Sequence, residues 1–239
     1  MKTRISLPLI ITVMFLAGAT LFAQEEKRPP RDLVIAQLDT VGTCSELAMT
    51  RTQGWVMVYD KGWAAYDAPP ACMNFMRAAT RGGMVIRVCR ITESGNWLVI
   101  AGANAFSYTV AVPQALKDKL MEMNQQSRFI TSVDFNDYDE WVLLAGKDVF
   151  ASDPATEAWI KEGINQYGRP LSVCLTEDAT IVVFGGGYLS RGYVPATLKA
   201  WLAQPPFRID CVRVFGDYWF IANGQGKYRC DLGDGPKSN

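Results

Sequence analysis

Carboxylates are the first candidates for chemistry in this chain, because its 239 residues include no histidine. That absence excludes Ser–His–Asp and Cys–His catalysis and the usual zinc sites. A pair of carboxylates can still hydrolyse a glycosidic bond. Seven acidic residues fall in equivalent turns of the repeat described below: Glu93, Asp137, Asp139, Glu140, Glu177, Asp178 and Asp217. Acidic residues also favour solvated turns, so the sequence assigns no catalytic residue.

The same turns offer hard oxygen ligands of the kind that Ca²⁺ prefers, with Asp137 and Asp139 as the best local pair. No Asp-rich ligand loop of adequate length surrounds them. There is also no phosphate-loop pattern and no dinucleotide fingerprint, and tight turns explain the glycine run 185–187. We therefore expect neither a metal nor a cofactor.

A second set of candidates combines aromatic rings with amides and carboxylates near the glycine-containing turns of the repeat. Flat apolar faces next to hydrogen-bonding groups suit sugars or peptides. The alternative interpretation is that these rings close the ends of the core. The set consists of Trp63, Asn104, Phe106, Asp148, Tyr188, Tyr193 and Tyr228.

An internal repeat of about 40 residues organises these candidates. One column of the repeat contains Trp55, Trp97, Trp141, Ile181 and Trp219. Eight residues earlier, a second apolar column contains Leu47, Cys89, Val133, Val173 and Cys211. Each copy has a proline before a pattern typical of an amphipathic helix, followed by three strand-like runs. The five copies lie near residues 29–67, 68–111, 112–152, 153–193 and 194–234.

The second strand of each copy is apolar on both faces, as Trp141–Ala145 illustrates, so both faces must be covered. We expect an α+β fold in which helix–strand–strand–strand repeats form one curved antiparallel sheet, half-barrel or barrel-like, with helices outside. In a closed sheet the tryptophan column is core, whereas in an open sheet it lines a groove. The alternative is a five-bladed β-propeller, since the repeat length matches, although propeller blades normally have four strands and no helix.

The run 129–135, followed by Trp141–Gly146 and Pro154, resembles the repeats of secreted bacterial proteins and of the non-catalytic N-terminal domain of polyglycine hydrolases. The resemblance covers most of the chain and implies a half-barrel-like sheet. In that family the nucleophile belongs to an attached β-lactamase-like domain. This sequence has no such domain and no Ser-x-x-Lys, so the resemblance implies a binding or accessory module.

The N-terminus has the three parts of a secretory signal: a basic start, an apolar run and a small residue, Ala23, before the expected cleavage point. We expect residues 1–23 to be a signal peptide and 24–239 a single domain of five repeats. The alternative is an uncleaved anchor, which Pro8 and Gly18 disfavour. Cleavage removes Lys2 and Arg4 from 24 basic residues and leaves the 24 acidic ones, a balance that argues against nucleic acid as a partner.

Export would permit disulfides among the six cysteines, and buried free thiols are the alternative. They are Cys44, Cys72, Cys89, Cys174, Cys211 and Cys230. Nothing after the apolar run indicates a membrane span. Taken together, these patterns predict a secreted or periplasmic, non-enzymatic recognition or scaffold module that binds peptide, glycan or protein. The alternatives are a carboxylate-based glycoside-type hydrolase and a structural envelope protein.

Overall fold

The computed structural model describes residues 30–52, 54–60, 62–233 and 236–238. The expected signal peptide, residues 1–23, lies outside these ranges. Within them, no helix has both the length and the apolar character needed to cross a membrane.

Each of the five described helices begins at a proline or directly after one, where the missing proline N–H has no intrahelical partner to lose. The helices are α1 (Pro30–Val41), α2 (Pro70–Arg81), α3 (Gln114–Gln125), α4 (Pro154–Tyr167) and α5 (Ala196–Ala203). Asp153 caps α4, because its carboxylate accepts hydrogen bonds from the N–H groups of Ala155 and Thr156.

Three antiparallel strands follow each helix and pair only within their own repeat. The first two sheets contain β1 (Glu46–Met49), β2 (Trp55–Tyr59) and β3 (Gly62–Tyr66), then β4 (Ile86–Ile91), β5 (Trp97–Ala101) and β6 (Ala105–Tyr108). The next two contain β7 (Ser132–Phe135), β8 (Trp141–Ala145) and β9 (Asp148–Ala151), then β10 (Pro170–Leu175), β11 (Ala179–Phe184) and β12 (Gly187–Gly192). The fifth contains β13 (Cys211–Phe215), β14 (Tyr218–Ala222), β15 (Tyr228–Asp231) and the added β16 (Pro236–Ser238).

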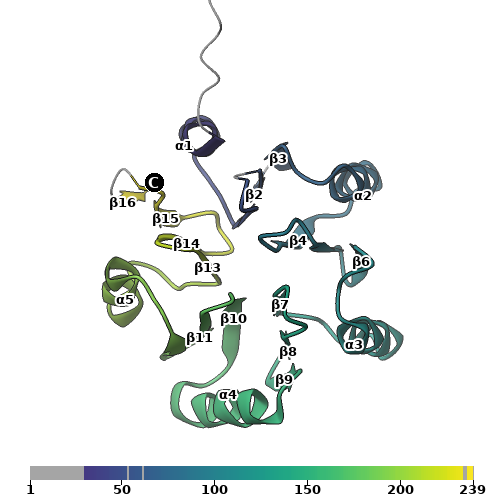
Figure 1. The fold of residues 1–239 in the computed structure, drawn as a ribbon, viewed down its shortest axis with the longest axis vertical. Coiled ribbons are helices and arrows are strands. Elements are labelled where there is room, and N and C mark those ends of the chain that lie inside the picture. Colours follow the sequence, from purple (N-terminus) through teal and green to yellow (C-terminus); the bar gives the residue numbers. More distant parts are fainter. Residues whose placement is uncertain (1–29, 53, 61, 234–235, 239) are drawn as a thin grey trace, which may run out of the picture.

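The five sheets radiate from a central axis, with the helices on the outside (Figure 1). The first strands β1, β4, β7, β10 and β13 lie nearest the axis, and each contacts the next around a ring that β13 closes on β1. The prediction of an α+β repeat fold is confirmed. The single curved sheet is not found, because the strands form five separate sheets in a propeller-like arrangement.

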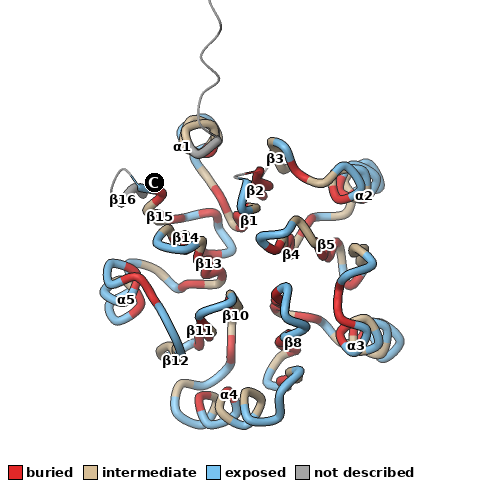
Figure 2. Tube along the Cα trace, in the orientation of Figure 1, coloured by how far each residue is buried: buried red, intermediate tan, exposed pale blue. Residues whose placement is uncertain are grey.

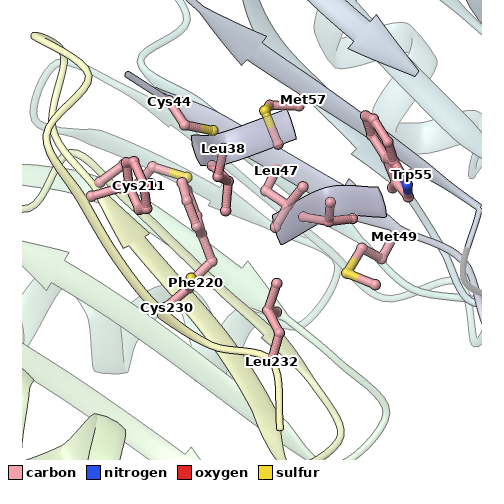
Figure 3. Close-up of a cluster of buried hydrophobic side chains, with 13 residues drawn as sticks. Leu38, Cys44, Leu47, Met49, Trp55, Met57, Cys211, Phe220, Cys230 and Leu232 are labelled. Atoms are coloured by element: carbon pink, nitrogen blue, oxygen red, sulfur yellow. The ribbon is translucent and has the colours of Figure 1, made fainter. Parts of the chain in front are cut away.

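Apolar cores lie between neighbouring sheets, and a helix covers the outer side of each core. Figure 2 shows buried segments along the strands and exposed ones on the outer helix faces. The core that closes the ring joins the first sheet to the fifth: Leu47 and Met57 pack in one cluster with Phe220, Cys230 and Leu38 of α1 (Figure 3). A middle strand therefore needs apolar residues on both faces because it has a neighbouring sheet on each side.

The tryptophan column is core. Trp55, Trp97, Trp141 and Trp219 are at most 6% exposed. Each packs into the gap between its own sheet and the preceding one.

Two residues are out of step with the predicted columns. Ile181 packs toward the fifth sheet, so it faces the opposite way from the tryptophans. Cys211 likewise packs into the gap toward the first sheet, unlike the other members of its column. Because side chains alternate along a strand, a shift of one residue reverses the face, and the turns of these two repeats differ in length from the others.

Candidate functional site

Four charged side chains meet on the axis, each from a different inner strand. Glu46 of β1 forms ion pairs with both arginines: its carboxylate lies 2.6 Å from Nη1 of Arg90 (β4) and 2.9 Å from Nε of Arg213 (β13). Asp134 of β7 lies 3.7 Å from Nε of Arg90 and 3.8 Å from Nη1 of Arg213. The charges therefore alternate around the axis. The remaining inner strand, β10, contributes the thiol of Cys174 beside them.

Strand register explains why three of these residues meet. Arg90, Asp134 and Arg213 each pair with the residue that follows the column tryptophan of the neighbouring middle strand, so they occupy one level of the ring. The corresponding residues in the other two sheets are the small or apolar Ala48 and Val173. Glu46 enters two positions earlier on β1.

The cluster is deeply buried and anchored to backbone. All four side chains are at most 8% exposed. Arg90 donates to the carbonyls of Val133 and Cys89, and Arg213 to that of Val173. Charge-assisted bonds of this kind hold the guanidinium groups in fixed orientations.

Burial raises the pKa of Asp134 to about 7, against the attraction of Arg90 and hydrogen bonds from the N–H groups of Leu175 and Phe135. Burial also raises the pKa of Glu46, again opposed by Arg90. The charged forms are costly here because little water reaches them, and the two arginines compensate that cost.

A cavity of about 280 Å³ lies beside this cluster, and all five sheets line it. Arg90, Asp134, Cys174 and Arg213 form its floor. An apolar residue at or next to the end of each inner strand lines the cavity, and together these residues form a ring that we call the apolar collar: Met49, Ile91, Phe135, Leu175 and Val214. Apolar walls above a few fixed polar groups are the usual composition of a small-molecule site.

The mouth of the cavity carries an ion-pair bridge between turns of different sheets. Nη2 of Arg51 lies 2.8 Å from Oε2 of Glu93 and 3.9 Å from Oε1 of Glu177. These residues belong to the first, second and fourth sheets, and all three line the cavity. Their side chains are 71%, 46% and 35% exposed, respectively, so the bridge is in contact with solvent. We call Arg51, Glu93 and Glu177 the mouth bridge.

Other polar residues of the mouth hold the turns together. Asp137 accepts hydrogen bonds from Thr92 Oγ1 (2.7 Å), Ser94 Oγ (2.6 Å) and Asn96 Nδ2 (3.0 Å) of the preceding repeat. Partial burial acts to raise the pKa of Asp137, but these bonds hold it below its ordinary value. Asn136 likewise donates to the carbonyl of Thr176 in the next repeat. Asp137 and Asn136 therefore stabilise the rim.

The predicted aromatic set is not brought together. Its members lie on or beside the outer strands of all five sheets: Trp63 on β3, Asn104 and Phe106 at β6, Asp148 on β9, Tyr188 and Tyr193 at β12, and Tyr228 on β15. Phe106 stacks on Tyr108, and the buried Tyr228 packs against Phe220. Ligand binding by this set stays a prediction, although these residues do not form a common site.

Asn104 and Tyr193, two members of the set, hold neighbouring repeats together. Asn104 donates to the carbonyl of Arg128 at 2.5 Å. Tyr193 follows β12 at the mouth end, away from the glycine-containing turn near which the set was predicted, and its hydroxyl donates to Asp217 at 2.7 Å. Both contacts link neighbouring repeats.

All six cysteines are buried free thiols, so the structure contains no disulfide between them. Burial raises the thiol pKa of Cys44 and of Cys174, which suppresses the reactive thiolate. Among the described residues, no group of three or more acidic or cysteine side chains is placed to hold a metal ion.

The chain matches no protein-family model and no curated protein sequence. The function must therefore be argued from the axial pocket itself.

The floor of this pocket was not predicted from the sequence. The signal was present, because Arg90 and Asp134 each stand seven residues before a column tryptophan and interrupt an apolar strand. Arg213 stands only six residues before Trp219, since its hairpin turn is shorter, and Glu46 comes from another level of the ring. These offsets hide the cluster from a search for repeated columns.

Proposed function

We propose that this protein is an exported recognition module that binds a small ligand, or one end of a longer ligand, in the axial pocket without transforming it. The observation that carries this proposal is the convergence of all five sheets on one cavity with apolar walls and a charged floor. Small-ligand sites are concave and mostly apolar, with a few placed polar groups, and they occur preferentially where separate structural elements meet. Export is supported by the N-terminal signal pattern alone.

The glycosidase alternative is less well supported by the same geometry. It needs two carboxyl groups about 5–10 Å apart on either side of the bond to be cleaved. Glu93 and Glu177 are the nearest match, but Arg51 occupies the space between them. Asp137 and Glu140 accept hydrogen bonds from other residues of the rim, so their carboxylates are already occupied in holding the turns together.

The test is a thermal-shift and calorimetry screen of the wild-type protein against two panels, tripeptides with free carboxyl termini and mono- and disaccharides. Leu175→Trp places a larger side chain in the apolar collar and should abolish any shift. Phe129→Trp, at an exposed position on the opposite end of the molecule, is the matched control and should retain it.

Two results would overturn the proposal. The first is that no member of the two panels binds. The second is that the protein releases p-nitrophenol from p-nitrophenyl glycosides and loses this activity when Glu93 or Glu177 is replaced. Binding that survives Leu175→Trp but is lost in Tyr188→Ala would move the site to the outer aromatic strands.

A further inference from the structure

Unused hydrogen-bond donors lie at the floor of the pocket. A guanidinium group has five N–H donors. Among the described residues, Nη2 of Arg90 makes no hydrogen bond, and Nη2 of Arg213 has only a 3.5 Å contact with Glu46 Oε2. The one described buried side-chain polar atom without a partner is Nε1 of Trp55. Nη2 of Arg90 is therefore not completely buried, and Arg90 lines the cavity.

These donors are fixed before any ligand arrives. Nε and Nη1 of Arg90 are held by Val133, Cys89 and Glu46, so the guanidinium plane cannot turn away. Arg213 is held in the same way by Glu46 and Val173. A planar acceptor with two oxygens, such as a carboxylate, is the group that preorganised guanidinium donors bind best.

The apolar collar, directly above the floor, disfavours a ligand that carries charge along its whole length. The apolar collar surrounds the space directly above the floor with one side chain from every sheet. Burial of an apolar group against this ring is favourable, whereas burial of a second charge would be costly. The cavity is at the small end of the range for ligand sites, which suits one apolar side chain with its backbone.

The outermost level favours positive charge. In the mouth bridge, two carboxylates share the single cation of Arg51, so the bridge carries a net negative charge. Asp178 and Asp217 lie in the neighbouring turns. A cationic group on the ligand could replace Arg51 between Glu93 and Glu177 without leaving either carboxylate unpaired.

We infer that the axial pocket receives the carboxyl-terminal end of a peptide: its free carboxylate on Arg90 and Arg213, its apolar last side chain in the collar, and a basic residue upstream between Glu93 and Glu177. This assignment rests on the proposed function. Capture of a terminal carboxylate by fixed donors is a recurrent mode of peptide recognition. A free apolar amino acid offers the first two groups only, so it should bind more weakly.

Binding of a carboxylate should be coupled to proton uptake. The axial cluster is neutral when Glu46 and Asp134 balance Arg90 and Arg213, so a bound carboxylate adds an uncompensated negative charge. Asp134 faces both arginines, the more distant Glu46, the Cys174 thiol and the N–H of Leu175. With a pKa of about 7, it is the group that can take up a proton. The affinity should therefore rise as pH falls from about 9 to about 7.

The experiment is isothermal titration calorimetry of the wild-type protein with four probes: Lys-Ala-Leu, its carboxyl-terminal amide, Glu-Ala-Leu and free leucine. The free acid Lys-Ala-Leu should bind about tenfold or more tightly than the amide, because the amide leaves charged donors without a charged partner. Lys-Ala-Leu should also bind more tightly than Glu-Ala-Leu, and this preference should disappear in the double variant Glu93→Gln/Glu177→Gln.

The outcomes separate this inference from the proposed function. Equal binding of acid and amide, with loss of both in Leu175→Trp, would refute the carboxylate assignment while leaving a binding pocket. Binding of saccharides alone would do the same. If free leucine binds as tightly as the tripeptide, the assignment of a peptide as the ligand is refuted, and the pocket is an amino-acid site instead. Failure of every probe and both panels would refute the two proposals together.

Discussion

The two ends of the molecule use the same residue type for different purposes. On β4, Arg90 lies on the floor of the axial pocket, and Arg87, three residues earlier, lies toward the opposite end. Arg87 donates to the backbone carbonyls of Gly102, Ala103 and Ile130, and Phe129 stacks on its guanidinium at 3.9 Å. Arg87 therefore uses its donors on backbone at the surface, whereas Arg90 lines a cavity and has one nitrogen, Nη2, without a hydrogen bond among the described residues.

The charges at the two ends also differ. The mouth carries the mouth bridge and the acidic turns, while Arg87, Arg128, Lys147 and Arg169 gather around Phe129 at the opposite end. The basic end forms a hollow lined by a single sheet and its neighbours, whereas the acidic end opens into a cavity lined by all five sheets. A binding site depends on convergence of elements and on preorganised donors, and the mouth end alone combines the two.

The largest effect should come from removing a buried charge at the mouth end. Arg90→Met leaves Glu46 and Asp134 with a single counter-charge in a buried site, and loss of one partner from a buried network costs about 3–5 kcal/mol. Arg87→Met should cost about 1–2 kcal/mol, because water can reach the carbonyls that it leaves. Urea denaturation of both variants measures the difference.

Equal destabilisation by the two substitutions would contradict the difference drawn between the ends, because both arginines would then act only as structural links between neighbouring segments. Arg90→Lys serves as a further control. It keeps the charge but loses the planar fork, so it should recover part of the stability without restoring affinity for a carboxylate.

Two glycines with positive φ sharpen the contrast between the ends. At the mouth end, a Cβ on Gly192 (φ +73°) would lie 1.7 Å from the carbonyl oxygen of Asp178. At the opposite end, a Cβ on Gly146 (φ +69°) would meet nothing within 4 Å. Gly146→Ala should therefore cost about 1 kcal/mol from backbone strain alone, and Gly192→Ala about 3 kcal/mol, since backbone must also move. Thermal denaturation of the pair decides whether the mouth turns are the more constrained.

The free energy of unfolding should depend on pH through the titration of Asp134 at the floor of the pocket. The pKa of Asp134 is raised from 3.8 to about 7 in the folded protein, so between these values the folded state holds a proton that the unfolded state has lost. The free energy of unfolding should fall as pH rises through this window, by at most about 1.4 kcal/mol per pH unit for one proton. Burial also raises the pKa of Glu46, which acts in the same direction.

Asp134→Asn removes the titrating group and is the control. The difference in stability between wild type and this variant should change between about pH 4 and pH 7 and remain constant above that range. A difference that does not vary with pH would show that Asp134 is ionised throughout, held by Arg90 and Arg213.

The sequence predicted the repeat and its helix–strand–strand–strand content, because proline before a helix and apolar strands leave local signals. It did not decide how the strands are covered. A middle strand such as Trp141–Ala145 can be covered on both faces by helices and its own curved sheet, or by two neighbouring sheets, and the apolar pattern is the same in both cases. The structure has the second arrangement.

The floor of the pocket could not be assembled from sequence for a related reason. Glu46 and Arg213 are 167 residues apart and meet only because the ring closes between the first and fifth sheets. The seven turn carboxylates, by contrast, were placed on one rim by the repeat alone. Sequence reasoning thus grouped the acidic turns, but it assigned ligand binding to the aromatic set rather than to the axis.

The smallest effect on stability, and the most specific one on binding, should follow from Arg51→Ala. The Arg51 side chain is 71% exposed, and exposed ion pairs contribute little, so the melting temperature should hardly change. The substitution leaves Glu93 and Glu177 without their shared cation, so a lysine-containing peptide should associate faster, and at low salt above all. Arg128→Ala, which removes the ion pair with Asp148 at the opposite end, should leave association unchanged. Stopped-flow measurements on both variants would show whether the mouth bridge is a gate: an association rate unaltered by Arg51→Ala would mean that the ligand enters without displacing it.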